Sequence, residues 1–334
     1  MHFKKFISTI ESHTAGMPTR VVYSGIPPIH GKTMKDKQEY FSKKFGHLRN
    51  ALMHEPRGHG SMFGAILTSP CSPEADFGAI FMSTTKYLDM CGHASIGIIT
   101  VLIECGFVEH IEPYTKIVLD TPAGLITGYA KVNKEKVEEV TIRNVPAFFY
   151  LSKEISVPKI GTINVDIAFG GNFYAIVNAS DIGLTVETKN AYKISEAAMI
   201  IKKLVNSEIK VSHPKKQNIN KVNFVLIYDK PTHPEAHAKN VVVSAKARQD
   251  RSPCGTGTCA RMATLWSKNE LKLNEEFINE SIIGTNFRGR LVSEVSVGDL
   301  KAAIPEITSS AFITGFSNYV IDPSDPLGSG FLLT

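Results

Sequence analysis

The sequence predicts an α+β fold made of two pseudo-symmetric halves, with one helix inside each half. Predicted strands outnumber predicted helices, and many strands follow one another in hairpin-like pairs. In addition, two stretches far apart in the chain, residues 89–97 and 250–259, repeat one layout. In each stretch a cysteine followed by glycine lies where a β-branched run has ended and a helix begins. Each half therefore presents one thiol at a helix start.

The two copies of this layout agree in their spacing. The upstream run spans residues 77–82 and precedes Cys91, and the downstream run spans residues 241–245 and precedes Cys254. Asn240 stands as far before Cys254 as Phe77 stands before Cys91. Apolar residues then follow at helical spacing, namely Ile96, Ile99, Leu102 and Ile103 upstream, and Met262, Leu265 and Trp266 downstream.

The other elements are predicted from the periodicity of the apolar residues. Helical spacing predicts helices over residues 35–53 and 194–205, and the charged run 131–139 is typical of a hairpin tip. We expect the final strand to return to the first half and close it. Strands are expected near residues 6–9, 20–23, 63–67, 77–82, 116–119, 125–132, 140–144, 162–169, 173–177, 222–228, 241–245, 277–283, 289–294 and 311–320.

The predicted domains follow the two halves. Residues 1–130, completed by residues 308–334, would carry Cys91, and residues 131–307 would carry Cys254. A chain of 334 residues with 43% hydrophobic side chains is long enough to bury a large core in two domains. No linker rich in Ser or Gly separates the halves, so we expect short strand-to-strand crossings to join them.

Composition excludes several classes of function. The net charge of +5 is mild, and no basic stripe with interleaved aromatic residues suggests nucleic-acid binding. No run of about 18 apolar residues predicts a membrane span. Five cysteines without the spacing of a disulfide framework favour free thiols, and therefore the cytoplasm. The charge supports only a weak preference for anionic substrates.

A cysteine at a helix start has a chemical advantage. The first helical turn carries unsatisfied N–H groups and a partial positive charge, which stabilise an anion. In that position the pKa of a thiol can fall from about 8.5 to between about 3.5 and 7.5. Two such helix starts would hold one carboxylate through their amides. Two thiols facing that carboxylate could move a proton at the carbon beside it, without a cofactor or a metal.

Each candidate also has a purely structural explanation. A free cysteine is usually a small buried hydrophobe, but the matching contexts favour catalysis for Cys91 and Cys254. The other cysteines, Cys71, Cys105 and Cys259, lack that context and are interpreted as structural.

Residues beside the two cysteines are weighed in the same way. His93 either packs as a cap residue or, as we favour, orients the thiol or donates to the substrate. Asp250 either bonds its own loop or, as we favour, receives a substrate ammonium. The stretch 255–258 superficially resembles a phosphate loop, but the Lys-Ser/Thr ending is missing, so its N–H groups suit a carboxylate better.

At these residues the chain resembles the proline racemase family, whose fold is related to that of diaminopimelate epimerase. The matching pieces run in family order over nearly the whole chain: Glu55-Pro56-Arg57-Gly58-His59, Met90-Cys91-Gly92-His93, Gly170-Gly171-Asn172-Phe173, Asp250-Arg251-Ser252-Pro253-Cys254-Gly255-Thr256-Gly257-Thr258 and Gly284-Thr285-Asn286-Phe287-Arg288-Gly289.

This resemblance implies two domains, each a mixed, mostly antiparallel sheet around a central helix, with the active site in the cleft between them. It also implies a homodimer and cofactor-independent inversion at Cα of proline or 4-hydroxyproline. By position, Cys91 and Cys254 would be the acid–base pair. Substrate contacts would come from Gly92, His93, Asp250, Gly255 and Thr256.

The resemblance bears on the choice of substrate as well. Family members that dehydrate trans-3-hydroxyproline carry a hydroxyl residue in place of Cys91, so inversion is favoured over elimination. Phe63 matches the bulky residue of proline racemases, where hydroxyproline epimerases tend to have a smaller one. A phenyl ring would leave a substrate hydroxyl unpaired, at a cost of roughly 1–3 kcal/mol, which favours proline. The chain departs from the family pattern at Met17, at Gly60-Ser61 and at Cys259.

Two other classes of function stay open on the residues alone. A cysteine hydrolase would need a Cys–His pair oriented by a third group, and His93 is too local to Cys91 to make that arrangement natural. A non-catalytic protein would bind proline, or would sense oxidants through reversible oxidation of its thiols.

Overall fold

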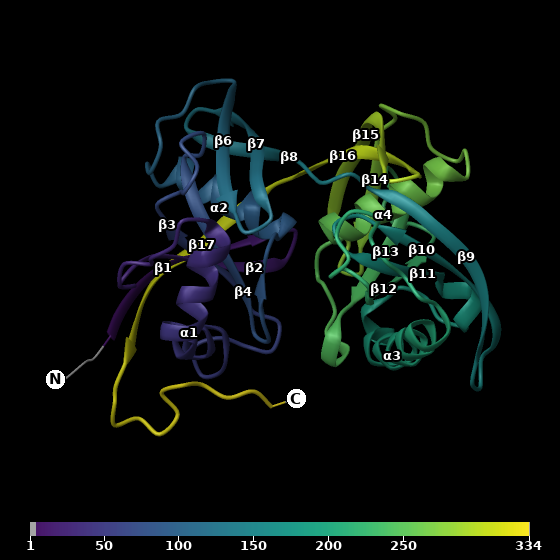
Figure 1. Ribbon diagram of the computed structural model, residues 1–334, viewed down its shortest axis with the longest axis horizontal. Coiled ribbons are helices and arrows are strands. Elements are labelled where there is room, and N and C mark those ends of the chain that lie inside the picture. Colours follow the sequence, from purple (N-terminus) through teal and green to yellow (C-terminus); the bar gives the residue numbers. More distant parts are fainter. Residues whose placement is uncertain (1–4, 334) are drawn as a thin grey trace. The chain divides into compact units, whose positions relative to one another are not determined.

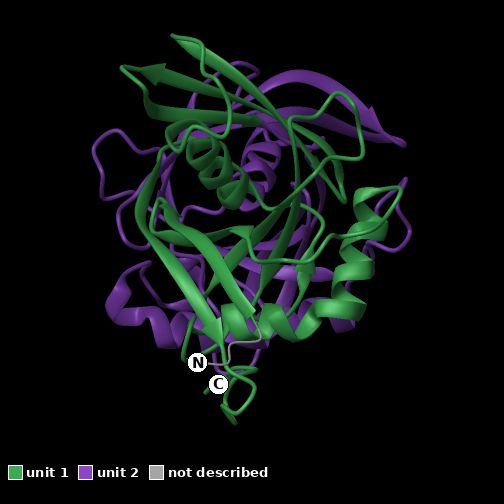
Figure 2. Cartoon of the chain, turned by 90° about the vertical axis from the view of Figure 1, so that its left-hand side faces the viewer, with its two compact units in different colours: residues 1–142, 309–334 green, residues 143–308 purple. Residues whose placement is uncertain are grey.

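The computed structural model describes residues 5–333, which form an α+β protein, as the sequence predicts. These residues contain seventeen strands and four α-helices. The chain splits into two compact units, drawn in green and purple in Figure 2. Unit 1 comprises Met1–Ile142 and Ser309–Thr334, and unit 2 comprises Arg143–Thr308.

Unit 1 contains the helices α1 (Met34–Met53) and α2 (Gly92–Glu104). A capping box starts α1, because the Thr33 hydroxyl accepts from the Asp36 N–H and the Asp36 carboxylate accepts from the Thr33 N–H. The strands of this unit are β1 (Lys5–Thr14), β2 (Met17–Ser24), β3 (Phe63–Thr68), β4 (Phe77–Ser83), β5 (Tyr87–Leu88), β6 (Tyr114–Thr121), β7 (Gly124–Asn133), β8 (Lys136–Arg143) and β17 (Ala311–Ile321).

Unit 2 contains the helices α3 (Ala191–Glu208) and α4 (Gly255–Ser267). Its strands are β9 (Phe148–Val157), β10 (Gly161–Phe169), β11 (Phe173–Asn178), β12 (Val222–Asp229), β13 (Ala238–Val243), β14 (Phe277–Ser281), β15 (Asn286–Val297) and β16 (Leu300–Ser309).

The two units have the same strand order. Neighbouring strands in unit 1 run β17–β1–β2–β3–β4–β6–β7–β8, with β5 added to β4, and those in unit 2 run from β9 to β16 in sequence. In each unit the third and fifth pairs of neighbours are parallel and the others are antiparallel. Parallel neighbours need a crossover connection, and α1 and α3 supply the first crossover while α2 and α4 supply the second.

The helices α2 and α4 lie among the strands of their own units (Figure 1). In unit 1, α2 contacts β1, β2, β3, β7 and β17, and in unit 2, α4 contacts β9, β10, β11 and β15. All residues of α2 from Gly92 to Ile103 are buried, as expected for a helix that is apolar on every side. No helix in the described part of the chain is long and apolar enough to cross a membrane.

Strand β11 is buried on both faces, which fixes the direction of each of its side chains. Phe173, Ala175 and Val177 join a core cluster that also contains α3 residues such as Ile201. The alternate residues Tyr174 and Ile176 belong to a second cluster, which includes Ala260 of α4 and has Cys254 packed against it. Since side chains alternate along a strand, Tyr174 faces the start of α4.

Most predicted elements are confirmed to within a few residues, and β17 pairs with β1 as expected of a strand that returns to the first half. The predicted strand at residues 241–245 is wrong at both ends, because β13 spans Ala238–Val243. A short 3₁₀ turn, Ala245–Ala247, follows it. Lys246 and Ala247 both have a φ of 57° there, a left-handed conformation that ends an extended strand.

Candidate active site

Cys91 is the residue immediately before α2, at its N-cap, with extended backbone (φ −146°, ψ 113°). Its carbonyl accepts hydrogen bonds from the Ser95 N–H (2.9 Å) and the Ser95 hydroxyl (2.8 Å). The side chain is 8% exposed. The predicted helix start is therefore confirmed, and the thiol lies at the positive end of a buried helix.

His93 and Phe63 lie together beside this thiol. The Cys91 sulfur is 3.5 Å from Nδ1 and 3.9 Å from Nε2 of His93. The His93 carbonyl accepts a bond from the Thr14 hydroxyl (2.8 Å), and Phe63 packs edge-on against the imidazole with ring centroids 5.0 Å apart. Thr14 therefore fixes the backbone of His93 and Phe63 packs on its ring, and the imidazole lies at a distance from which it can orient the thiol.

Cys254 is the N-cap of α4, and its backbone lies in the left-handed region (φ 65°, ψ 107°). For a non-glycine residue this conformation costs on the order of 1–3 kcal/mol, and such strain concentrates at functional sites. Two bonds hold the residue there: its N–H donates to the Ser252 hydroxyl (3.2 Å), and its carbonyl accepts from the Thr258 N–H (2.8 Å).

Asp250 organises the loop that leads to Cys254. Its Oδ1 accepts hydrogen bonds from the N–H (2.9 Å) and the hydroxyl (2.8 Å) of Ser252. Its own N–H donates to the carbonyl of Val242 in β13 (2.9 Å). The carboxylate thus performs the structural role that the sequence analysis weighed against substrate binding, and it places a negative charge near the Cys254 thiol.

Tyr174 approaches Cys254 from β11. The phenol oxygen is 2.6 Å from the Thr256 hydroxyl and 3.5 Å from the Cys254 sulfur. Tyr174 is 1% exposed, and its ring stacks on Phe224 with centroids 5.2 Å apart. Cys254, Thr256 and Asp250, all named from the sequence, are thus neighbours in unit 2, together with one residue that the sequence analysis missed.

Burial raises the pKa of the Cys254 thiol far above its usual value, and the charge of Asp250 raises it further. Hydrogen bonds from Tyr174, from the Gly257 N–H and from Thr256 lower the pKa by less. The expectation that a helix start lowers the thiol pKa is therefore wrong for Cys254, because desolvation outweighs the helix terminus. The raised pKa favours the thiol form of Cys254 over the thiolate.

Two glycines, Gly257 and Gly170, allow neighbouring atoms to lie very close to the first turn of α4. A Cβ on Gly257 would lie 3.3 Å from the Cys254 sulfur. A Cβ on Gly170 would lie 2.3 Å from the Thr256 carbonyl oxygen and 2.5 Å from the Ala260 nitrogen, which no side chain tolerates. Gly170 therefore lets the turn before β11 contact the helix backbone directly.

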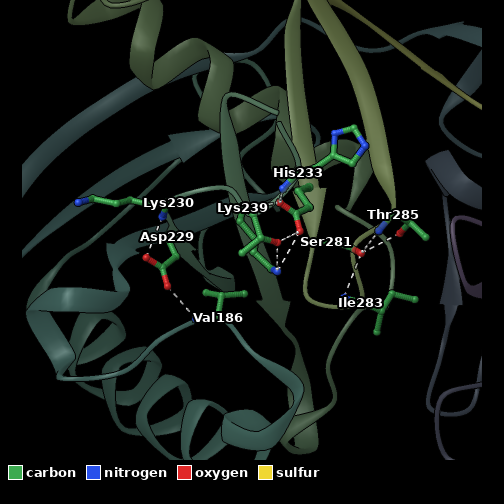
Figure 3. Close-up of polar contacts among 10 residues, drawn as sticks. Val186, Asp229, Lys230, His233, Lys239, Ser281, Ile283 and Thr285 are labelled. Carbon is green, nitrogen blue, oxygen red and sulfur yellow. Dashed lines mark hydrogen bonds and ion pairs between the residues drawn. The ribbon is translucent and has the colours of Figure 1, made fainter. Parts of the chain in front are cut away.

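The motif that begins at Gly284 lies in a polar turn after β14. The amides of Ile283 and Thr285 donate to the Ser281 hydroxyl, at 3.3 and 3.1 Å (Figure 3). Next to it, Lys239 of β13 forms a buried ion pair with Glu280 of β14 (2.9 Å). The ion pair joins the parallel neighbours β13 and β14, and the amide bonds to Ser281 close the turn that follows β14.

The interpretation of the remaining cysteines as structural residues stays a prediction. Cys259 is fully buried and accepts a bond from the Asn144 amide (3.4 Å), and burial raises the pKa of its thiol to about 12. Burial also raises the pKa of Cys71 and Cys105. Among residues 5–333, no group of three or more His, Cys, Asp or Glu side chains is placed to hold a metal ion.

Tyr174 is the neighbour of Cys254 that sequence reasoning did not find. The motif named from the sequence stops at Phe173, one residue earlier. The available signal was a polar tip inside the apolar run 173–177, because a buried phenol usually has a hydrogen-bond partner.

The fold and these contacts define an α+β protein in which each unit presents a cysteine at the start of its central helix. A family model described as "Proline racemase" matches residues 9–332. A protein named "Proline racemase" from Clostridioides difficile is 50% identical over 334 residues, which is 100% of both chains. The chain belongs to the proline racemase family.

Relatives with other names match over the same length. A "4-hydroxyproline 2-epimerase" from Streptosporangium roseum is 43% identical over 334 residues, and a "Trans-3-hydroxy-L-proline dehydratase" from Bacillus thuringiensis subsp. konkukian is 41% identical over 333 residues, each match covering 100% of both chains. A crystal structure of a hydroxyproline epimerase from Agrobacterium vitis, with bound trans-4-hydroxy-L-proline, matches with a TM-score of 0.89 and 34% identity, covering 100% of this chain and 97% of that chain.

Proposed function

We propose that this protein is a cofactor-independent proline racemase in which Cys91 and Cys254 are the acid–base pair. The observation that carries the proposal is the pair of cysteines at the starts of α2 and α4, in two units of identical strand order. In this proposal the units are two domains and proline binds in the cleft between them. The 50% identity to a proline racemase supports the reaction class.

The substrate carboxylate would be bound by backbone amides at both helix starts. Gly92 and His93 would supply N–H groups from α2, and Gly255 and Thr256 would supply them from α4. Asp250 would attract the substrate ammonium in addition to bonding its loop. The same amides would stabilise the negative charge that develops when Cα loses its proton, which is electrostatic catalysis by preorganised donors.

The proton transfer uses one thiolate and one thiol. In one direction of the reaction Cys91 is the thiolate, and it removes the Cα proton from one face of the ring. Cys254 gives its proton to the opposite face of the carbanion, which inverts the centre. The enzyme then holds a protonated Cys91 and a Cys254 thiolate, the form that accepts the other enantiomer. Two thiols that share one proton would titrate as a coupled pair.

Proline is proposed as the substrate because Phe63 fills space beside His93 and offers no partner to a substrate hydroxyl. 4-Hydroxyproline 2-epimerase is the second candidate, favoured by the full-length match to an epimerase structure with trans-4-hydroxy-L-proline bound. Dehydration of trans-3-hydroxyproline is disfavoured, because the position of Cys91 holds a thiol and not a hydroxyl.

The deciding experiment follows optical rotation and Cα deuterium uptake in D₂O with L-proline and with trans-4-hydroxy-L-proline. We expect inversion and solvent deuterium incorporation with proline. Cys91→Ser and Cys254→Ser should each abolish racemisation, because inversion needs an acid and a base on opposite faces. The matched control is Cys105→Ser, which should keep full activity. A single mutant of Cys91 or Cys254 that still racemises proline would refute the two-base scheme.

The same experiment separates the other classes of function. A cysteine hydrolase would be trapped as an acyl-enzyme and would leave the rotation of proline unchanged. A proline-binding or redox-sensing protein would bind proline without isotope exchange. The homodimer implied by the family resemblance and the cytoplasmic location inferred from the free thiols both stay predictions. Sedimentation of the purified chain would test the oligomeric state.

A further inference from the structure

The buried phenol of Tyr174 is not explained by packing alone. Its ring is fixed by β11 and by stacking on Phe224, and its oxygen ends between two polar groups, the Thr256 hydroxyl at 2.6 Å and the Cys254 sulfur at 3.5 Å. Those two groups are 3.9 Å from each other. The phenol, the Thr256 hydroxyl and the Cys254 thiol therefore form a closed cluster within unit 2. This cluster contains the thiol that is proposed to exchange a proton with Cα.

Such a cluster suits both charge states of a cysteine that alternates between acid and base. When Cys254 is a thiol, its S–H donates to the phenol oxygen, and the phenol O–H donates to the Thr256 oxygen. When Cys254 is a thiolate, the Thr256 O–H donates to the phenol oxygen, and the phenol O–H donates to the sulfur. Apart from the thiol proton, which Cys254 gives to the carbanion, the two arrangements differ only in the rotation of the two hydroxyl hydrogens, and no proton passes between the phenol, the Thr256 hydroxyl and the sulfur.

We propose that Tyr174 is a positioning residue of the reaction. Its phenol, which is itself fixed by the Thr256 hydroxyl, holds the Cys254 side chain in place. It accepts a hydrogen bond from the thiol and donates one to the sulfur when the sulfur becomes negative. This inference rests on the proposed function. The phenol supplies Cys254 with the hydrogen-bonding neighbour that His93 supplies to Cys91. A hydrogen bond to an ionised group is roughly twice as strong as a neutral one, so the thiolate gains more from Tyr174 than the thiol does.

The experiment has to measure a property of the Cys254 thiol itself. The two enantiomers of proline have equal free energies, so kcat/KM is equal in both directions for every variant and cannot reveal which thiol has changed. We therefore propose measuring the rate at which iodoacetamide alkylates Cys254, by peptide mass spectrometry at pH 8, with Cys71 and Cys105 of the same sample as internal references. Only the thiolate reacts, so the rate follows its population.

Tyr174→Phe removes one oxygen and keeps the ring. We expect alkylation of Cys254 to slow about tenfold, because one lost hydrogen bond to the thiolate corresponds to about one pKa unit. We also expect kcat to fall by about the same factor while KM for proline changes by less than about twofold, since Tyr174 does not touch the substrate. Cys254 alkylated at the wild-type rate in a folded Tyr174→Phe protein would overturn the inference.

Matched variants keep the test decisive. Tyr150→Phe removes a phenol oxygen from the same unit on β9 and should leave both the alkylation rate and kcat unchanged. Thr256→Val should slow alkylation as Tyr174→Phe does, and Thr256→Ser, which keeps the hydroxyl, should restore it. If Tyr174→Phe fails to fold, the Thr256 pair decides, and equal rates in Val and Ser variants overturn the inference. A wild-type protein without Cα exchange would instead refute the proposed function, whatever the alkylation rates.

Discussion

Phe63 is the side chain on which the proposed choice of proline over 4-hydroxyproline rests. It stands at the first residue of β3 and packs edge-on against His93, the imidazole beside the Cys91 thiol. An aromatic pair of this kind contributes about 0.5–1.5 kcal/mol beyond its buried area. Its phenyl ring therefore both shapes the space at the thiol and fixes the imidazole, so a smaller residue would change specificity and rate together.

Phe63→Ser should lower kcat/KM for L-proline by about tenfold, and it should raise the ratio of trans-4-hydroxy-L-proline to proline turnover by at least about tenfold. The serine opens space and offers a hydroxyl to the substrate. Chiral chromatography of both reactions checks the result. Phe316→Ser, at a residue of unit 1 that is 70% exposed, is the control and should change neither rate. An unchanged ratio would remove Phe63 from the specificity argument.

The pKa of the Cys254 thiol moves in the direction opposite to the one that its position at a helix start predicts. A helix start lowers a thiol pKa when the sulfur is solvated, but here burial and Asp250 raise it. The left-handed backbone of Cys254 is a second cost that the surrounding loop must offset. Both features support the hypothesis that Cys254 has a catalytic role, because backbone strain and strongly shifted pKa values concentrate at functional sites.

At the scale of elements, the Cys254 loop depends on how strongly β13 is held to β14. This parallel pair spans only three paired positions, Ala238–Asn279, Lys239–Glu280 and Asn240–Ser281. Lys239 and Glu280 add an ion pair in which both side chains are less than 10% exposed. Burial alone would raise the pKa of Glu280, but bonds from Thr232, from the His233 N–H and from Lys239 lower it to about 2.

This lowered pKa predicts how stability depends on pH. A carboxyl whose pKa falls from 4.5 to about 2 on folding contributes about 3 kcal/mol at neutral pH. The contribution is complete above pH 4.5 and is lost as the pH falls towards 2. Glu280→Gln should therefore destabilise the protein by about 3 kcal/mol or more at pH 7, where Lys239 is left buried and unpaired, and the difference from wild type should shrink between pH 4.5 and 2.

Urea unfolding at a series of pH values measures this difference. Glu294→Gln is the matched control, because Glu294 pairs with Lys301 on the surface, where both side chains are more than half exposed. Such pairs contribute only about 0–1 kcal/mol. A gap between wild type and Glu280→Gln that stays constant down to pH 2 would show that the ion pair is not the source of the stability.

At the scale of the whole molecule, the two units are not simply the first and second halves of the chain. Unit 2 is one continuous segment, Arg143–Thr308, whereas unit 1 needs the C-terminal segment from Ser309. Strand β17 pairs along the full length of β1 and contacts α2, the helix that starts at Cys91. The position that β9 fills in unit 2 is thus filled in unit 1 by the last strand of the chain.

A chain that ends at Ser310 should therefore lose the order of unit 1 and keep that of unit 2. Removing β17 uncovers β1 residues that are now buried, such as Ile7 and Ile10. Hydrogen exchange should show loss of protection in β1 and α2, with protection kept in β10 to β13. A chain that ends at Ile321 keeps β17 and is the control. Protected β1 amides in the shorter chain would contradict the role assigned to β17.

The sequence by itself determined both helix starts and most of the elements, but it did not predict the strands β5, β9 and β16. Local periodicity and the Cys-Gly pairs placed the starts of α2 and α4 within one or two residues. This was possible because helical and extended periodicity depend on residues that are close together in the sequence. The motifs that identify the family are also local. The α+β class followed from the same patterns, as did the return of the last strand to the first half.

Only the tertiary structure decided which way Tyr174 points and in which direction the Cys254 pKa moves. Strand β11 is apolar throughout, so its sequence does not say which face meets α3 and which meets α4; the register of β10, β11 and β12 does. The pKa depends on how much water the surrounding strands exclude from the sulfur. Both properties arise from segments distant in the chain, and no local pattern carries them.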